Sequence, residues 1–310
     1  MFQVHLSFIA VGIFLSGLLI MTPPARAQLS AFEKELIQSN IDLSEGLDSF
    51  AEGLDIFLTG RKVTKAQNKT NVVISNSTYH SEGQSVKNST HLDVNLRLPN
   101  LEEYWQLRFT SYDENEEDRG VEKTYFRRSP RAENYGASLG LFKKFGNIRT
   151  IFRPRVKLQD PLQISYILRF ETDADLKSYR IKPRLEFFAH PDKGTGVFTA
   201  FNIDLLFSPA YSLTFLNEGE YQDFRNIFSA SNGLSLAQIL TRKTAMIYSF
   251  VFQSNSRPDY HLQSYVASVG WNQVVYKRVL ETRLVPYLDF SKERSFKGNA
   301  GISFNVALIF

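Results

Sequence analysis

Residues 300–310 read AGISFNVALIF, and their side chains alternate between the two faces of an extended chain. Apolar residues occupy every second position from Ala300 to Phe310, and small or polar residues occupy most positions between them. Successive side chains of a β-strand point to opposite faces, so this stretch predicts a strand with one wholly apolar face. Its length fits a tilted membrane-spanning strand of about 9–11 residues better than an average strand of about 5–6.

The same period of two residues recurs along most of the chain after residue 71. Clear examples are THLDVNLRL (90–98), WQLRF (105–109), LQISYILRF (162–170) and VFTAFNIDLLF (197–207). Counted together, such runs predict an all-β chain of about fourteen antiparallel strands, with twelve as the rival count because the first pair alternates less clearly. Pro154, Pro183 and Pro286 conflict with this prediction, since each would remove a ladder hydrogen bond inside a strand.

The N-terminus carries the pattern of an export signal. Residues 6–21, LSFIAVGIFLSGLLIM, are apolar, and TPPARAQ follows them. The triplet Ala25-Arg26-Ala27 matches an A-x-A cleavage site, which predicts that residues 1–27 are a signal peptide and that the mature chain starts at Gln28. The segment before the apolar run has no Lys or Arg, so a retained N-terminal anchor is the alternative.

The signal peptide, the alternating strands and the terminal Phe310 together resemble bacterial outer-membrane β-barrel proteins, whose last strand ends in Phe. The resemblance implies a transmembrane antiparallel barrel over residues 71–310 in the bacterial cell outer membrane, surrounded by lipid and lipopolysaccharide. It also implies that the barrel assembly machinery binds the C-terminal strand, with Phe310 as the assembly signal. Alternation alone leaves a soluble periplasmic β-sandwich open, in which the apolar faces would point inward.

Residues 28–70 follow a different period. Apolar residues such as Phe32, Leu36, Leu43 and Phe50 recur at helical spacing, and Asp and Glu dominate the other face. We therefore expect a periplasmic amphipathic helical segment followed by a linker. It would pack against a larger surface, plug the barrel or bind a periplasmic protein partner.

In the barrel register, three consecutive strands place eight cations in the lumen, and we call this set the basic wall. It consists of Arg149, Arg153, Arg155, Lys157, Arg169, Arg180, Lys182 and Arg184. The acids predicted to face the lumen include Glu171, Glu186, Asp204, Glu281 and Asp289. Two interpretations stay open: structural pairing with acids across the lumen or on the 30–59 helix, or a wet surface that prefers anions. The acidic stretch DENEED at 113–118 is expected outside, as a solvated loop tip, with the binding of divalent cations near lipopolysaccharide as the alternative.

Several other functions find little support. The net charge of +4 does not predict nucleic-acid binding in an exported protein. The sequence has no cysteine, no His–Glu metal spacing and no Gly-rich phosphate loop, so neither a metal nor a cofactor is expected. The His-x-Ser pattern of outer-membrane phospholipases occurs only at His5-Leu6-Ser7, within the predicted signal peptide, so no catalytic residue is expected.

The predicted function is therefore a non-enzymatic pore or channel for small, anionic solutes that pass through a basic lumen. The first alternative is a plugged structural or assembly barrel whose periplasmic helix binds a partner. A lipid-acting outer-membrane enzyme is the lower alternative.

Overall fold

The structure is a computed structural model that describes residues 38, 41, 45, 71–97, 105–276 and 279–310. Residues 1–46 form one unit, in which the three described residues are helical, and the rest of the chain forms another. The predicted signal peptide and all other residues of the 28–70 segment lie outside the described residues. Among the described residues, no helix is both long enough and apolar enough to cross a membrane.

Fifteen strands make up the second unit, together with short helices. The strands are β1 (Asn71–Ser81), β2 (Lys87–Arg97), β3 (Trp105–Thr110), β4 (Gly136–Phe145), β5 (Ile148–Lys157), β6 (Gln163–Glu171), β7 (Ala174–Leu176), β8 (Tyr179–His190), β9 (Gly194–Ser208), β10 (Tyr211–Gln222), β11 (Ile227–Thr241), β12 (Thr244–Asn255), β13 (His261–Tyr276), β14 (Leu280–Ser291) and β15 (Gly298–Ile309). The helices are α3 (Glu114–Glu117), α4 (Val121–Tyr125) and the 3₁₀ turn η1 (Lys292–Arg294).

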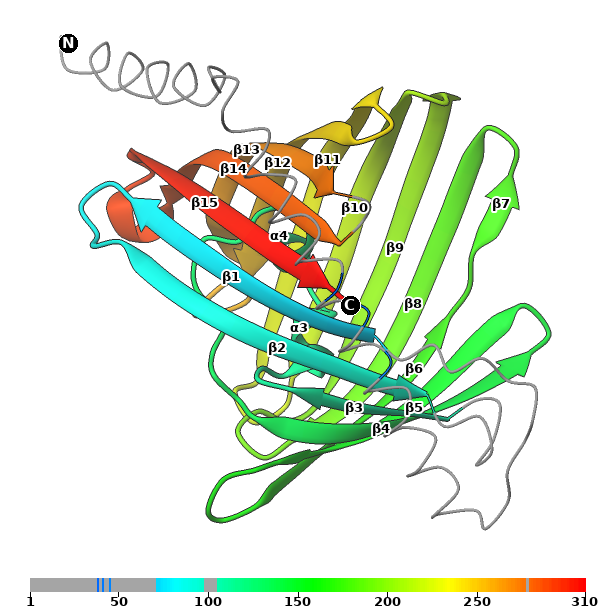
Figure 1. Cartoon of the computed structure of the whole chain (residues 1–310). Coiled ribbons are helices and arrows are strands. Elements are labelled where there is room, and N and C mark those ends of the chain that lie inside the picture. The colour runs from blue at the N-terminus through cyan, green and yellow to red at the C-terminus, as the bar shows by residue number, and fades with distance from the viewer. Residues whose placement is uncertain (1–37, 39–40, 42–44, 46–70, 98–104, 277–278) are drawn as a thin grey trace, which may run out of the picture. The chain divides into compact units, whose positions relative to one another are not determined.

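The strands close into one antiparallel ring (Figure 1). β15 pairs with β1, so that Asn305 lies opposite Ser77, and β6 pairs with β8, so that Arg169 lies opposite Glu186. The short β7 also pairs with β8, and it shares one position in the ring with β6. The result is a closed barrel of fourteen strand positions, which confirms the predicted fold and count.

Outward and inward positions of the barrel differ as the alternation predicts. Phe152, Phe187 and Phe201 are exposed on the outside, whereas Arg153 and Arg155 are buried on the inside of β5. Large apolar side chains around the outside of a closed barrel with a polar interior are the arrangement of an outer-membrane barrel, since lipid covers the apolar face. The chain is a β-barrel of the bacterial outer membrane, and the soluble sandwich is wrong.

Two of the three strand prolines lie where the pairing to one neighbouring strand is interrupted, while the pairing to the other neighbouring strand continues. Pro154 pairs with Tyr166 of β6, while neither it nor Arg153 appears in the ladder to β4. Pro286 pairs with Ile302 of β15 and is absent from the ladder to β13. The register is the same before and after each gap, so the strands accommodate a missing N–H without a bulge.

Pro183 accounts for a displaced turn. The alternation predicts a turn at 172–175, but the strand resumes at β7 and the chain reverses at Lys177, whose φ is 62°. The β6 ladder to β8 ends at Arg184, next to Pro183, and the β7 ladder begins at Ile181. The proline therefore lies at a break within the strand position that β6 and β7 share.

Candidate functional site

The connection from β3 to β4, residues 111–135, folds into the barrel and is called the lumen loop below. Figure 1 shows α3 and α4 of this loop inside the ring of strands. Asp113 caps α3, because its carboxylate accepts a hydrogen bond of 3.0 Å from the backbone N–H of Asn115. Asp113, Glu114 and Asn115 are buried, so the expectation of a solvated outer tip at 113–118 is wrong.

A fully buried ion pair joins the lumen loop to β5. Glu114 Oε2 lies 2.6 Å from Arg155 Nη1, and each side chain is only 1% exposed. The hydroxyl of Thr110 accepts a 2.6 Å bond from Arg155 and donates a 2.9 Å bond to Glu114. Arg155 also donates to the backbone carbonyl of Asn134. These bonds compensate the cost of removing both charges from water.

Asp118 faces three arginines of the basic wall. Its Oδ2 lies 3.4 Å from Arg153 Nη1 and 3.2 Å from Arg169 Nη2, and Arg184 donates to its backbone carbonyl. Burial acts to raise the pKa of the Asp118 carboxyl, but Arg169, Arg153 and Arg184 outweigh it and hold the pKa below its ordinary value. The carboxylate is therefore ionised at neutral pH and serves as a shared counterion.

Glu186 is the second shared counterion of the basic wall and is fully buried. Its Oε2 lies 2.7 Å from both Arg169 and Arg184, and its Oε1 lies 3.1 Å from Arg119 of the lumen loop. The Arg119 guanidinium also stacks 4.1 Å from the ring centre of Phe188. The loop thus supplies a cation as well as acids to this side of the barrel.

The remaining residues of the basic wall have partners on the strands or lie apart from the loop. Arg149 pairs with Glu171 on β6, Arg180 lies 2.9 Å from Asp175, and Lys182 lies 2.6 Å from Asp204. Lys157 is half-buried at the end of β5. Of the two other predicted lumen acids, Asp289 pairs with Arg128 and Arg294, whereas Glu281 lines a separate cavity described below.

The opposite end of the lumen loop is fixed by apolar packing. Val121 and Phe126 are completely buried among side chains of β10, β12, β13 and β14. Those wall residues are Leu216, Val251, Val266, Val285 and Tyr287. Two polar contacts lie nearby, because Arg128 of the loop pairs with Asp289 and Arg283 donates to the carbonyl of Tyr125. The loop consequently spans the lumen from the basic wall to the strands facing it.

A cavity of about 230 Å³ lies beside the loop, next to β15, β1 and β2. Four cations line it, Lys123, Arg127, Arg131 and Arg283, with Asp93 as the one lining carboxylate among the described residues. Asp93 is itself bound by Arg108, at 2.8 Å. The charge of the cavity surface is therefore positive.

Three of these four cations have contacts within the lumen loop. Arg127 and Arg131 share a single carboxylate, that of Glu117. Lys123 donates to the backbone carbonyl of Glu116, and burial holds its pKa below the ordinary value. A carbonyl oxygen does not neutralise a cation, and among the described residues the cavity lining has more cations than carboxylates.

A second cavity of about 470 Å³ lies beside the first, at the turn between β11 and β12. The two share Arg283, Asn305 and Ala307 in their lining, so both open onto the same inner surface of β14 and β15. Glu281, predicted to face the lumen, lines this second cavity with Arg242 and Lys243 of the turn.

Histidine and serine side chains also meet in the lumen. His91 Nε2 lies 3.1 Å from Ser89 Oγ, and its Nδ1 lies 3.4 Å from Ser111 Oγ. The ring packs edge-on against Tyr112, with ring centres 5.8 Å apart. This group has the serine two positions before the histidine and faces the lumen, unlike the lipid-facing His-x-Ser pattern sought in the sequence.

The sequence held a signal for the lumen loop that alternation does not reveal. DENEED carries five acids in six residues, and Val121, Tyr125 and Phe126 follow it closely. A solvated loop tip would leave these apolar side chains exposed to water. The basic wall requires counterions, and the acidic stretch is the densest run of acids in the chain after residue 71.

Phe310 closes the barrel seam. Its backbone exchanges hydrogen bonds of 2.8 and 3.1 Å with Val72 of β1. The assembly signal predicted for this residue thus lies at the junction of the first and last strands. Its recognition by assembly machinery stays a prediction.

No protein-family model matches the sequence, and no curated protein matches it. Solved structures resemble its fold at very low sequence identity. A loop-deleted OmpT, an outer membrane protein of Vibrio cholerae, is 7% identical with a TM-score of 0.49, over 79% of this chain and 99% of that one. The channel DcaP of Acinetobacter baumannii is 6% identical with a TM-score of 0.45, over 81% and 99%. The KdgM porin is 6% identical with a TM-score of 0.38, over 76% and 98%. No residue role carries over at this distance.

Proposed function

We propose that the chain is a non-enzymatic outer-membrane pore for small anionic solutes, which pass beside the lumen loop. The observation that carries the proposal is the cationic lining of the cavity formed by Lys123, Arg127, Arg131 and Arg283. Rings and rows of Arg and Lys favour anions in pores.

The basic wall itself is not the anion path in this proposal. Glu114, Asp118 and Glu186 bind its buried arginines at 2.6 to 3.4 Å, so those guanidinium groups already have counterions. A permeating anion would have to displace these carboxylates. The cavity on the other side of the loop is lined by four cations, of which Arg127 and Arg131 share one carboxylate, that of Glu117.

The loop also favours a narrow pore over a wide one. It reaches both sides of the barrel through the Glu114–Arg155 pair and the Phe126 cluster, so it restricts the free lumen. Small solutes fit beside it, whereas extended polymers would have to move it. A barrel plugged completely by the loop, with a structural or assembly role, is the second candidate, and the same observation favours it.

Planar-bilayer recordings test the proposal. With a potassium chloride gradient across the bilayer, the reversal potential of the native chain should show a preference for chloride. The double variant Lys123→Gln with Arg283→Gln should lose most of that preference. The double variant Arg225→Gln with Lys297→Gln, which removes two charges in exposed connections, should leave it unchanged.

Other outcomes separate the candidates. A native chain that prefers potassium would contradict the anionic solute. A correctly folded chain without any conductance would contradict the pore and favour the plugged barrel. Interactions with lipopolysaccharide, the assembly machinery and a periplasmic partner of residues 28–70 are further proposals that these recordings do not address.

A further inference from the structure

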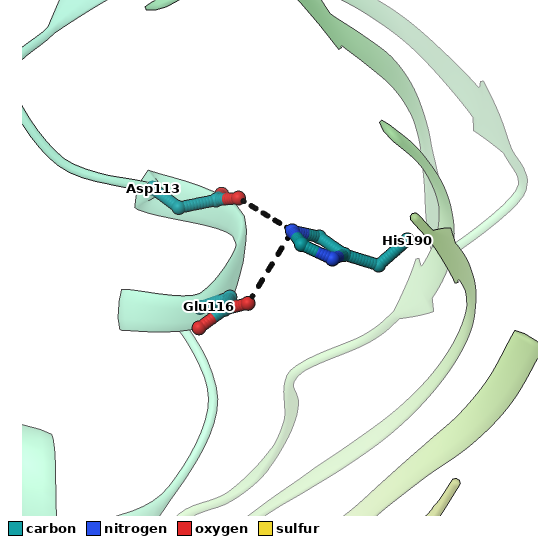
Figure 2. A group of neighbouring side chains, drawn as sticks. All are labelled: Asp113, Glu116 and His190. Carbon is teal, nitrogen blue, oxygen red and sulfur yellow. Dashed lines mark ion pairs between the residues drawn. The ribbon is translucent and has the colours of Figure 1, made fainter. Parts of the chain in front are cut away.

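Asp113, Glu116 and His190 bring three potential metal ligands together where the lumen loop meets the end of β8 (Figure 2). His190 Nε2 lies 3.5 Å from Asp113 Oδ2 and 3.5 Å from Glu116 Oε1. All three ligand atoms lie within 4.8 Å of one another. The two carboxylates come from α3 and its cap, and the imidazole comes from the barrel wall, so the group joins two separate elements.

The spacing matches a zinc-type coordination shell. In a tetrahedral site with bonds of about 2.1 Å, neighbouring ligand atoms are about 3.4 Å apart. The observed separations of 3.5 Å from the imidazole nitrogen to each carboxylate oxygen agree with that edge. Catalytic-type zinc sites likewise have three protein ligands and keep the fourth position for water.

Burial and charge favour a cation here. The side chains of Asp113 and His190 are only 7% and 9% exposed, whereas Glu116 is 27% exposed and gives water access to the group. Burial alone would raise the pKa of the Asp113 carboxyl, but its bond with His190 and the charge of Arg155 hold that pKa below the ordinary value. Asp113 therefore offers an ionised carboxylate in a partly dry setting.

Two neighbours compete with a metal ion and make the site testable. Lys193 Nζ lies 3.1 Å from Glu116 Oε1 and would have to move away from that oxygen. The backbone N–H of Asp192 donates a 3.2 Å bond to His190 Nδ1, which places the ring proton on Nε2, between the two carboxylates. A metal ion takes the place of that proton, and the neutral ring then carries its hydrogen on Nδ1. The contact with Asp192, in the exposed turn after β8, opens in this step.

We propose that Asp113, Glu116 and His190 bind one divalent transition-metal ion of the zinc class, with water as the fourth ligand. The ion fixes the start of α3 to the end of β8. The acidic stretch 113–118 allowed divalent cations only at an outer loop, because His190 is far along the chain and no His–Glu spacing links it to Asp113 or Glu116. The proposal is independent of the solute that the pore carries.

Zinc titration of the full chain refolded in detergent, without lipopolysaccharide or a polyhistidine tag, tests the proposal. One zinc ion per chain should bind, and X-ray absorption should show only nitrogen and oxygen ligands at about 2.0–2.1 Å. His190→Ala should abolish this binding, and Glu116→Gln should weaken it at least tenfold. His261→Ala should leave it unchanged, since the His261 ring contacts the backbone carbonyl of Asp259 and the side-chain amide of Gln263.

Lys193→Gln separates a metal site from a simple salt-bridge cluster. Removing the competing ammonium group should strengthen zinc binding several-fold if the three residues are ligands. Heat-modifiable gel mobility shows that each variant has folded. Absence of zinc binding, binding that survives in His190→Ala, or displacement of zinc by an equal concentration of calcium would overturn the proposal.

Discussion

The pair of Glu114 and Arg155 shows how single residues hold the lumen loop in place. Both side chains are buried to 1% exposure and share Thr110 as a bridging hydroxyl. Removing one partner of such a pair leaves an uncompensated buried charge, whereas removing both does not. The pair therefore holds the loop in place mainly because undocking would leave one of the two buried charges without its partner.

Glu114→Gln should destabilise the folded chain by about 3 kcal/mol, because Arg155 loses the nearer of its two buried counterions and keeps only Asp113, at 3.8 Å. Denaturant unfolding in detergent, followed by intrinsic fluorescence, measures the change. Arg149→Gln is the control, since Arg149 is 60% exposed beside Glu171 and its loss should cost at most about 1 kcal/mol. The double variant Glu114→Gln with Arg155→Met should regain much of the stability, and a purely additive loss would contradict this account.

The lowered pKa of Asp118 predicts that docking of the lumen loop against the basic wall weakens in acid. Its pKa in the folded chain lies below the ordinary value of 3.8, so its contribution to docking is fully present above about pH 4. That contribution is lost as the pH falls through the lower, docked pKa. Bilayer conductance should therefore stay constant down to about pH 4, and should rise and become noisier as the pH falls further. Asp118→Asn should show the noisier state already at neutral pH, whereas a pH-independent conductance in both chains would refute the prediction.

At the scale of elements, the sequence predicted the strands but did not predict the path of the lumen loop. Lipid imposes a period of two on every strand, so runs such as residues 162–170 were predictable without knowing their neighbours. The path of residues 111–135 depends on partners more than thirty residues away, as in the contact of Asp118 with Arg169. Local composition cannot reveal such a contact. It showed a charged stretch, which is most often a solvated loop.

The pairing around the strand prolines is a second feature that the sequence alone does not reveal. Pro154 and Pro286 conflict with the alternating pattern, since a proline within a sheet usually lies at a bulge, a strand end or an edge strand. The barrel instead omits the pairing on one side and keeps the register. A one-sided gap is invisible in a single sequence, because it depends on which neighbour each N–H faces.

Replacing residues 114–130 with a short Gly-Ser linker should open the barrel. The loop carries the acids that neutralise the basic wall, so its removal should raise the single-channel conductance several-fold and also strengthen the preference for anions. Bilayer recordings at neutral pH measure both quantities, and gel mobility confirms a folded barrel. Unchanged conductance would mean that the loop does not restrict the lumen.

At the scale of the whole molecule, the barrel pairs its interior charges with a segment of its own chain. From the sequence, the arginines of β5 could face acids across the lumen, acids of the 30–59 helix or solute anions. The structure places Glu114 and Asp118 against Arg155 and Arg153. Further cations, Lys123 and Arg283 among them, line the cavity on the other side of the loop.

The central claim, that residues 111–135 lie inside the barrel, can be tested by thiol labelling. The chain has no cysteine, so a single Val121→Cys variant reports on one position. Val121 is 1% exposed in the apolar cluster, and cysteine is small enough to replace it. The account predicts that a charged, water-soluble thiol reagent labels Val121→Cys at least a hundredfold more slowly than Arg225→Cys in the exposed turn after β10. Equal labelling rates in folded barrels would contradict it.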